Sequence, residues 1–265
     1  MPDKELSFLI LGDIIGSPGM RAVISSLGKL KTLYRPHCII ANAENAHKGF
    51  GITSEVVQLL QHNDVDAITT GNHVWRQEGV AELLDREENV LRPVNYPAIC
   101  AGKGWCLLEV QRAKVMIINA QGRKLMTAID CPFRTIQSTV KNHGGQADII
   151  IVDFHAEDVM EKQALGHYLD GKVGLLYGTH THTQTRDARI QPQGTGFCTD
   201  IGACIPRNSV IGFNAQASID GMITNVPYPF IVEENTAIIH GLFVTIDSAT
   251  GHCTTIQTIR YESTV

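Results

Sequence analysis

The strongest constraint on the fold is a pattern that recurs along the chain: a short apolar run that ends abruptly at a polar residue. The segments with this pattern are residues 7–13, 37–45, 66–73, 148–157 and 173–182. Runs of this length are typical of buried β-strands. Between them, apolar residues recur at helical spacing over residues 18–33, 53–63, 133–143 and 158–170. Alternating strands and helices predict an α/β protein built in layers.

Other signals describe the organisation of the chain. Residues 104–120 predict two antiparallel strands joined at Gln111 and Arg112, and residues 237–262 predict a hairpin that turns at 248–251. From residue 195 onward the pattern is mostly strand, and the glycine- and proline-rich stretch 200–230 predicts a small lobe or a long loop. Because no linker divides the sequence, we expect residues 1–265 to form a single domain.

The polar residues with chemical potential gather at the carboxyl ends of the predicted strands. They are Asp13, Glu44, Asn45, Asn72, His73, His155, His180 and His182. In layered α/β proteins the loops at these strand ends converge on one crevice. Each residue alone has a structural interpretation: Asp13 as a turn or cap, Gly71 as a turn glycine with positive φ, and His155 as a satisfied core histidine. Five strand ends that carry only such residues favour a common site.

Carboxylate, amide and imidazole groups without thiolates indicate a catalytic metal site, and their number suits two ions of manganese, iron or zinc. The seven predicted ligands are Asp13, Glu44, Asn45, Asn72, His155, His180 and His182. Two such cations can clamp a phosphate and activate a water molecule. His73 is then left beside the predicted ligand Asn72, where it is suited to give a proton to a leaving oxygen.

Composition excludes several other classes of protein. The formal net charge of −5 gives no broad basic face for duplex nucleic acid or for an anionic membrane. The first residues lack the basic start and the long apolar stretch of a signal peptide or a membrane span. Seven cysteines contain no C-x-x-C pair, which favours reduced thiols and a cytoplasmic location.

Read together, the motifs resemble those of the calcineurin-like metallophosphoesterases. In two places they depart from that superfamily: Asp13 is followed by Ile14 and Ile15 instead of Asp-x-His, and residues 42–45 read NAEN instead of Gly-Asp-x-x-Asp. Both departures match the YmdB-like bacterial branch. The motifs that carry this resemblance are GDIIG (12–16), NAENA (42–46), GFGIT (49–53), TGNHVW (70–75), DFHAE (153–157), EK (161–162), GTHTHT (178–183) and TDIG (199–202).

This resemblance implies an αββα metallophosphoesterase sandwich, with mixed sheets flanked by helices. It also implies a phosphodiesterase with two iron or manganese ions, zinc being an alternative, in which a metal-bound hydroxide opens a 2′,3′-cyclic nucleotide to a 3′-nucleotide. By position, Glu44 bridges the metals, and Asn45 is a ligand or a phosphate contact. The other implied roles are Asp13 and His182 on one metal, Asn72, His155 and His180 on the other, and His73 as the catalytic histidine.

Several alternatives stay open at this point. The same residues suit a phosphomonoesterase or protein phosphatase, because a fold alone does not choose a substrate. The chain could instead be a regulator that acts by binding a nucleotide or an RNA end, without catalysis. A homodimer or homotetramer is compatible with each of these functions. For the substrate, Trp75 and Tyr96 are weaker candidates for base stacking, and Arg186 and Arg189 for phosphate contact.

Overall fold

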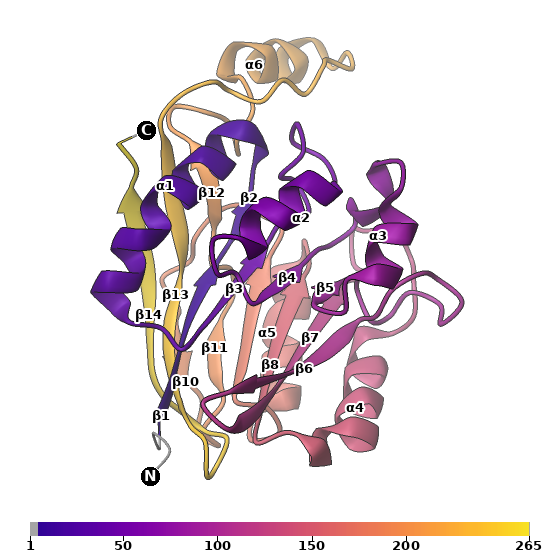
Figure 1. Cartoon of the computed structure of the whole chain (residues 1–265). Coiled ribbons are helices and arrows are strands. Elements are labelled where there is room, and N and C mark those ends of the chain that lie inside the picture. The colour runs from indigo at the N-terminus through magenta and orange to yellow at the C-terminus, as the bar shows by residue number, and fades with distance from the viewer. Residues whose placement is uncertain (1–4, 265) are drawn as a thin grey trace.

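The apolar runs form the central strands of two β-sheets that pack face to face in a computed structural model describing residues 5–264 (Figure 1). The first sheet has the order β2 (Asp13–Ile14), β12 (Ala203–Pro206), β13 (Ala237–Asp247), β1 (Glu5–Leu11), β3 (Cys38–Asn42), β4 (Ala67–Thr69) and β5 (Val90–Leu91), and β14 (Cys253–Glu262) pairs with β13. The second has the order β10 (Arg189–Ile190), β11 (Gly196–Cys198), β9 (Leu175–Thr179), β8 (Ile149–His155), β7 (Ala113–Gln121) and β6 (Trp105–Val110).

Helices cover the outer face of each sheet. The helices on the first sheet are α1 (Gly16–Tyr34), α2 (Ser54–Gln61) and α3 (Val80–Arg86), and those on the second are α4 (Pro132–His143) and α5 (Val159–Leu169). Alternation along β1 shows the layering: Leu9 and Leu11 pack toward the helices, whereas Phe8 and Ile10 pack between the sheets. The predicted αββα sandwich of two mixed sheets is therefore confirmed.

Parallel pairing brings the predicted site residues to one edge of the sandwich. In the first sheet β3 pairs in parallel with β1 and with β4, and in the second β8 pairs in parallel with β7 and with β9. Parallel neighbours end at the same edge of a sheet. As one example, His155 at the end of β8 lies opposite Thr179 at the end of β9.

Local signals explain several elements. Thr53 accepts a hydrogen bond from the Val56 N–H, which confirms it as the N-cap of α2. The predicted turn between β6 and β7 is confirmed, with Gln111 and Arg112 at φ of 50° and 74°. The hairpin of β13 and β14 is also confirmed. Within residues 5–264, no helix has the length and apolar character needed to cross a bilayer.

The structure adds one helix that was not predicted, and it corrects the strand-rich expectation for the region after residue 195 and the expectation for Gly71. A helix that was not predicted, α3, has only seven residues and begins after Gly79 without a side-chain cap. Another, α6 (Ala215–Thr224), lies in the region expected to be mostly strand, lobe or loop. It faces the protein mainly through small residues, so no amphipathic pattern announces it. Gly71 does not have positive φ, and its role is to leave space instead.

The remaining short elements are two turns of 3₁₀ helix, at Val74–Arg76 and Gly144–Gln146. All seven cysteines are free, and five of them are buried, as expected for small apolar residues.

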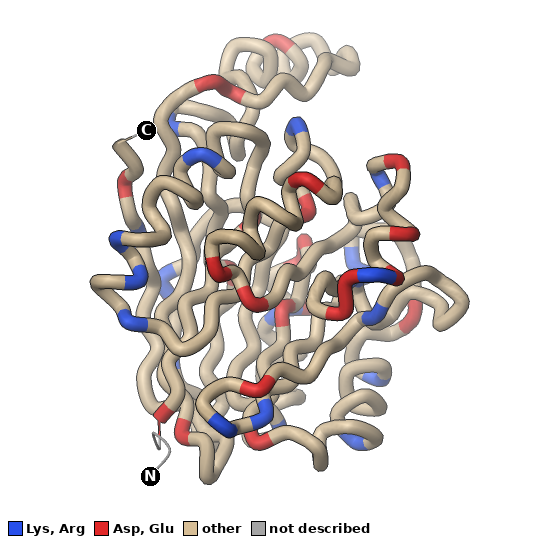
Figure 2. Tube along the Cα trace, in the orientation of Figure 1, with Lys and Arg blue, Asp and Glu red and all other residues tan. Residues whose placement is uncertain are grey.

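Figure 2 shows lysine and arginine interspersed with aspartate and glutamate along the trace of the sandwich.

Candidate metal centre and catalytic histidine

Strand ends from both sheets meet in a small buried polar centre. Glu44 follows β3, His155 is the last residue of β8, and His180 follows β9. The local packing is tight, because a Cβ atom on Gly71 would lie 2.2 Å from His155 Cδ2 and 2.3 Å from Glu44 Oε2. Only glycine lets the loop after β4 pass this close to the centre.

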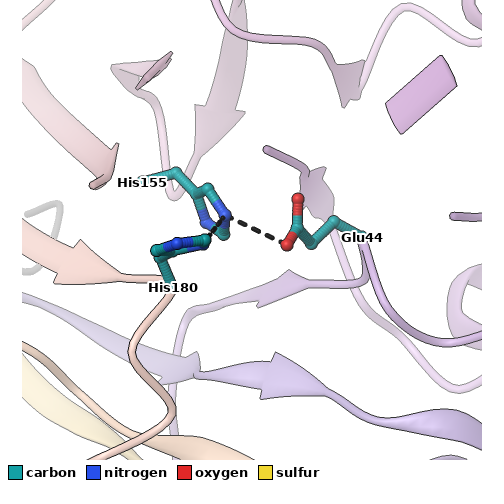
Figure 3. Close-up of side chains that lie close together, drawn as sticks. All are labelled: Glu44, His155 and His180. Carbon is teal, nitrogen blue, oxygen red and sulfur yellow. Dashed lines mark hydrogen bonds and ion pairs between the residues drawn. The ribbon is translucent and has the colours of Figure 1, made fainter. Parts of the chain in front are cut away.

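The centre is organised around one nitrogen atom, His155 Nε2. It lies 3.0 Å from Glu44 Oε1, 3.1 Å from Asn72 Oδ1 and 3.0 Å from His180 Nδ1. Figure 3 shows the side chains of Glu44, His155 and His180 pointing toward one another. Their ligand atoms all lie within 4.8 Å of one another, a spacing that can hold a metal ion.

The electrostatics of this centre are those of a cation site. Burial disfavours the charged form of His155, but Glu44 and Asp13 outweigh it and raise its pKa to about 9. Burial also opposes ionisation of Glu44, yet the charges of His155 and His73 hold its pKa well below the usual range. For His180, burial and the charge of His155 lower the pKa to about 3. The proton on His155 Nε2 is thus surrounded by acceptor atoms, and the same atoms are suitable ligands for a metal ion.

Hydrogen bonds on the far side of two histidines direct their other ring nitrogens toward the centre. His155 Nδ1 lies 2.9 Å from Thr179 Oγ1, and that hydroxyl donates to Asp153 Oδ1 at 2.7 Å. Because the threonine proton goes to Asp153, the hydroxyl accepts the His155 Nδ1–H. His180 Nε2 lies 3.1 Å from the Glu157 carboxylate, which leaves Nδ1 facing inward.

His182 and Asp13 lie beside the same centre. His182 Nδ1 donates to the Ile211 carbonyl at 2.9 Å, so its Nε2 is the nitrogen that carries the lone pair. Asp13 is fully buried, and its Oδ2 accepts a hydrogen bond from the His180 backbone N–H at 3.1 Å. Its Oδ1 accepts no hydrogen bond among residues 5–264, although it lies 3.7 Å from His155 Nδ1. A buried carboxylate oxygen without a donor fits the need for a cation.

Asp13 and His182 do not join the tight group formed by Glu44, His155 and His180 within the part of the chain that is described. The structure therefore brings Glu44, His155 and His180 close together and places Asp13 and His182 beside them. Burial is the largest cause of the raised pKa of Asp13, and the charges of His155 and His182 oppose that shift. A cation between these groups would replace the missing donor of Asp13.

Asn45 connects this centre to His73. Its amide oxygen lies 2.8 Å from His73 Nδ1, and its amide nitrogen donates to Glu44 Oε1 at 3.1 Å. The same nitrogen lies 3.3 Å from His182 Nε2. In this orientation an N–H group faces the predicted ligands, so Asn45 holds His73 here and would become a metal ligand only after its amide rotates.

Two buried residues that were not assigned a role support the loop that carries the two histidines. Lys162 Nζ donates to the Thr179 carbonyl at 2.8 Å and to Asp200 Oδ2 at 2.7 Å. Asp200 Oδ2 also accepts from the Thr181 N–H and hydroxyl, at 3.2 and 2.8 Å. Both charged side chains are only 1 % exposed. A lysine on the apolar face of the predicted helix, three residues before Leu165, was the available signal.

The weaker substrate candidates contact neighbours other than the predicted ligands. Trp75 and Tyr96 pack against each other edge to face, with ring centroids 5.6 Å apart. Arg189 pairs with Asp187 at 3.2 Å, and Arg186 is exposed. Their roles in base stacking and phosphate contact therefore stay predictions.

The layered fold and the His/Glu centre define this chain as a metallophosphoesterase-like α/β protein. The chain belongs to the YmdB-like family, which it matches over residues 9–259. It is 37 % identical to the 2′,3′-cyclic-nucleotide 2′-phosphodiesterase of Bacillus subtilis over 96 % of each chain.

Two solved structures are similar over almost the whole chain. One is a protein of Thermus thermophilus, with a TM-score of 0.92 and 35 % identity, covering 97 % of this chain and all of that one. The other is described as a novel phosphatase of Mycoplasma pneumoniae, with a TM-score of 0.92 and 32 % identity, covering 98 % of this chain and 94 % of that one.

Proposed function

We propose that this chain is a two-metal phosphodiesterase that opens 2′,3′-cyclic nucleotides and releases 3′-nucleotides. The observation that carries the proposal is the convergence of Glu44, Asn72 and His180 on His155 Nε2, at a centre formed by both sheets. The substrate class comes from the Bacillus subtilis relative, whose name gives this reaction. Fe and Mn suit the mixed oxygen and nitrogen donors, and Zn²⁺ would accept them as well.

In the proposed centre Glu44 would be shared by two cations. Asn72, His155 and His180 would hold one cation, and Asp13 and His182 would hold the other. When bound, two such cations polarise the phosphate oxygens and supply an activated water as nucleophile. Asn45 either binds a metal after its amide rotates or contacts the phosphate.

His73 is the proposed proton donor. Its side chain is 18 % exposed, and its Nδ1 is held by Asn45 Oδ1, so Nε2 is the nitrogen that can face a substrate. In the proposed step the water oxygen bonds to phosphorus and releases a proton to solvent, the bond from phosphorus to the 2′ oxygen breaks, and the doubly protonated His73 gives its Nε2 proton to that oxygen. The His73 backbone N–H donates to Glu44 Oε2 at 3.1 Å, which ties its position to the metal centre.

The test compares wild type with His73→Ala after loading with Mn²⁺. The variant should keep its bound metal and lose turnover of 2′,3′-cyclic AMP by roughly 10²–10⁴-fold, the usual effect of a positioned acid. His62→Ala is the matched control, because His62 is exposed and bonds only its own helix. If the variant keeps full activity, the assignment of the acid is wrong. If metal-loaded wild type cleaves neither this substrate nor bis-p-nitrophenyl phosphate, the reaction class is wrong.

A phosphomonoesterase is the second candidate, because the Mycoplasma pneumoniae structure is described as a phosphatase. Turnover of p-nitrophenyl phosphate and its diester on one preparation separates the two reactions. A regulator that acts by binding a nucleotide or an RNA end differs from both: an inactive His73→Ala protein would then still restore the phenotype of a deletion strain.

A further inference from the structure

An aromatic cluster lies directly beside the proposed proton donor. The Phe50 ring makes an edge contact with His73, with the centroids 4.9 Å apart. Phe50 also contacts Phe213 at 5.6 Å and Phe230 at 5.7 Å, and the last two contact each other at 5.2 Å. We name Phe50, Phe213 and Phe230 the aromatic platform. Its ring nearest the site, Phe50, directly contacts the histidine that the proposed reaction uses.

Two members of the platform, Phe213 and Phe230, belong to a segment, residues 207–236, that packs beside the site. This segment contains α6, which projects from one end of the sandwich (Figure 1). The Ile211 carbonyl accepts from His182 Nδ1, so the same segment touches a predicted metal ligand. It is also seated on the loop before α2, because Phe213 and Val232 pack against the Cα of Gly49 closely enough to exclude a Cβ. Segment 207–236 therefore contacts both a predicted metal ligand, His182, and the loop before α2.

The members of the platform differ in how much water they meet. Phe213 is 6 % exposed and serves as its base, whereas Phe230 is 55 % exposed. Phe50 is half-buried between them. The exposed ring of Phe230 is separated from His73 by Phe50. Such a ring near a catalytic group suits a planar ligand, because base–aromatic stacking works with any nucleobase.

The charged residues of segment 207–236 favour binding of a neutral ring over binding of a phosphate chain. The basic residue of segment 207–236 is Arg207 at its start, which pairs with Glu262, and its acidic residues are Asp220, Glu233 and Glu234. Figure 2 shows the projecting segment with acidic residues. Polyanions such as an RNA backbone or an anionic membrane need a basic surface. The phosphate would stay at the metal centre, and the platform would take the uncharged part of the substrate.

We propose that the aromatic platform is the nucleobase subsite, with Phe230 as the residue that stacks on the base. This inference rests on the proposed cyclic-nucleotide activity and adds to it the residues that select a nucleotide over a baseless phosphodiester. Stacking tolerates every base, so the subsite favours nucleotides in general without strong preference among bases.

The test uses two substrates that differ only in the base: 2′,3′-cyclic AMP and methyl riboside 2,3-cyclic phosphate. Phe230→Leu keeps apolar volume and removes the ring, and it should lower the ratio of kcat/KM for these substrates at least about fivefold, the lower end of one base stack. Phe230→Tyr restores a ring and should restore the ratio. Met222→Ala is the control, because Met222 is 77 % exposed in the same segment and makes no ring contact with the platform.

A binding measurement separates failure of this inference from failure of the proposed reaction. By calorimetry, wild type should bind 3′-AMP more tightly than methyl riboside 3-phosphate, and Phe230→Leu should lose that difference even if no substrate is cleaved. The inference is overturned if the two ligands bind wild type equally, or if Phe230→Leu leaves the difference unchanged. It is also overturned if Phe230→Leu changes only the mass of the protein in light scattering, since Phe230 would then contact a second copy.

Discussion

At the scale of single residues, Gly71 shows how closely the loop after β4 approaches the metal centre. Gly71→Ala would place a Cβ 2.2 Å from His155 Cδ2 and 2.3 Å from Glu44 Oε2. We expect this variant to lose Mn²⁺ binding in calorimetry, because the two predicted ligands must move apart. Gly28→Ala is the control: its Cβ would meet nothing within 4 Å in α1, so stability should rise by up to ~1 kcal/mol. Normal metal binding by Gly71→Ala would contradict the packing described here.

Thr179 relays the hydrogen bond that sets the tautomer of His155. Thr179→Val removes the hydroxyl between His155 Nδ1 and Asp153, while Thr179→Ser retains it. Loss of such a supporting hydrogen bond typically weakens metal binding by about 10–100-fold. We expect that loss for valine and near-normal affinity for serine, measured by competition with a fluorescent chelator. Equal affinities for the two variants would show that the relay is without effect.

The raised pKa of His155 predicts that metal binding displaces a proton. In the metal-free protein His155 is charged at pH 7.5, because its pKa is about 9. Its Nε2 must lose that proton to bind a metal, so affinity should rise from pH 7 toward 9 and then level off. Calorimetry at pH 7.5 in buffers of different ionisation enthalpy should show about one proton released at this site. Binding without proton release would contradict the direction of the shift.

At the scale of elements, the ion pair of Lys162 and Asp200 joins α5 to the segment after β11, and Asp200 in turn binds Thr181 in the loop after β9. Lys162→Met leaves Asp200 buried without its partner, so the free energy of unfolding should fall by about 3–5 kcal/mol. Lys124→Met is the control, because its pair with Asp158 is half-exposed and contributes ~1 kcal/mol or less. Urea denaturation of the metal-free proteins measures both.

The same ion pair supports the loop that carries His180 and His182, and a double variant tests whether its two side chains act together. His180 and His182 have φ of 97° and 61°, a conformation that non-glycine residues adopt only when the surroundings hold it. Because Asp200 binds Thr181 between them, the pair supports both histidines. The double variant Lys162→Met/Asp200→Asn should cost less than the sum of the single variants. Strict additivity would mean that the two side chains act independently.

At the scale of the whole molecule, the predicted ligands join the two sheets. Glu44 and Asn72 follow strands of the first sheet, and His155 and His180 belong to the second. Metal binding should therefore stabilise the sandwich: at a hundred times the Kd, Mn²⁺ should raise Tm by about 5–10 °C. EDTA should reverse the shift, and Glu44→Gln should reduce it. Scanning calorimetry measures this, and an equal shift in Glu44→Gln would place the bound ion elsewhere.

Much of the fold could be predicted from the sequence because its signals are local. The period of the apolar residues defined most strands and helices, and turn residues such as Gln111 defined hairpins. The helices that were missed lacked these signals, since α3 is short and α6 exposes Ile219, Met222 and Ile223. The gathering of polar residues at strand ends predicted their convergence, because parallel strands end at one edge.

Tertiary structure alone decided how these residues meet. Only the packing of the two sheets brings His155 Nε2 within 3.1 Å of acceptors from three separate loops. Only packing places Asp200 against Lys162, thirty-eight residues earlier in the chain, and Phe230 against Phe50. The physical reason is one of range: periodicity and turn chemistry act over a few residues, whereas distances, burial and pKa shifts arise between segments far apart in the chain. The sequence by itself thus determined the layers and the chemical types at the strand ends, and the fold decided their geometry.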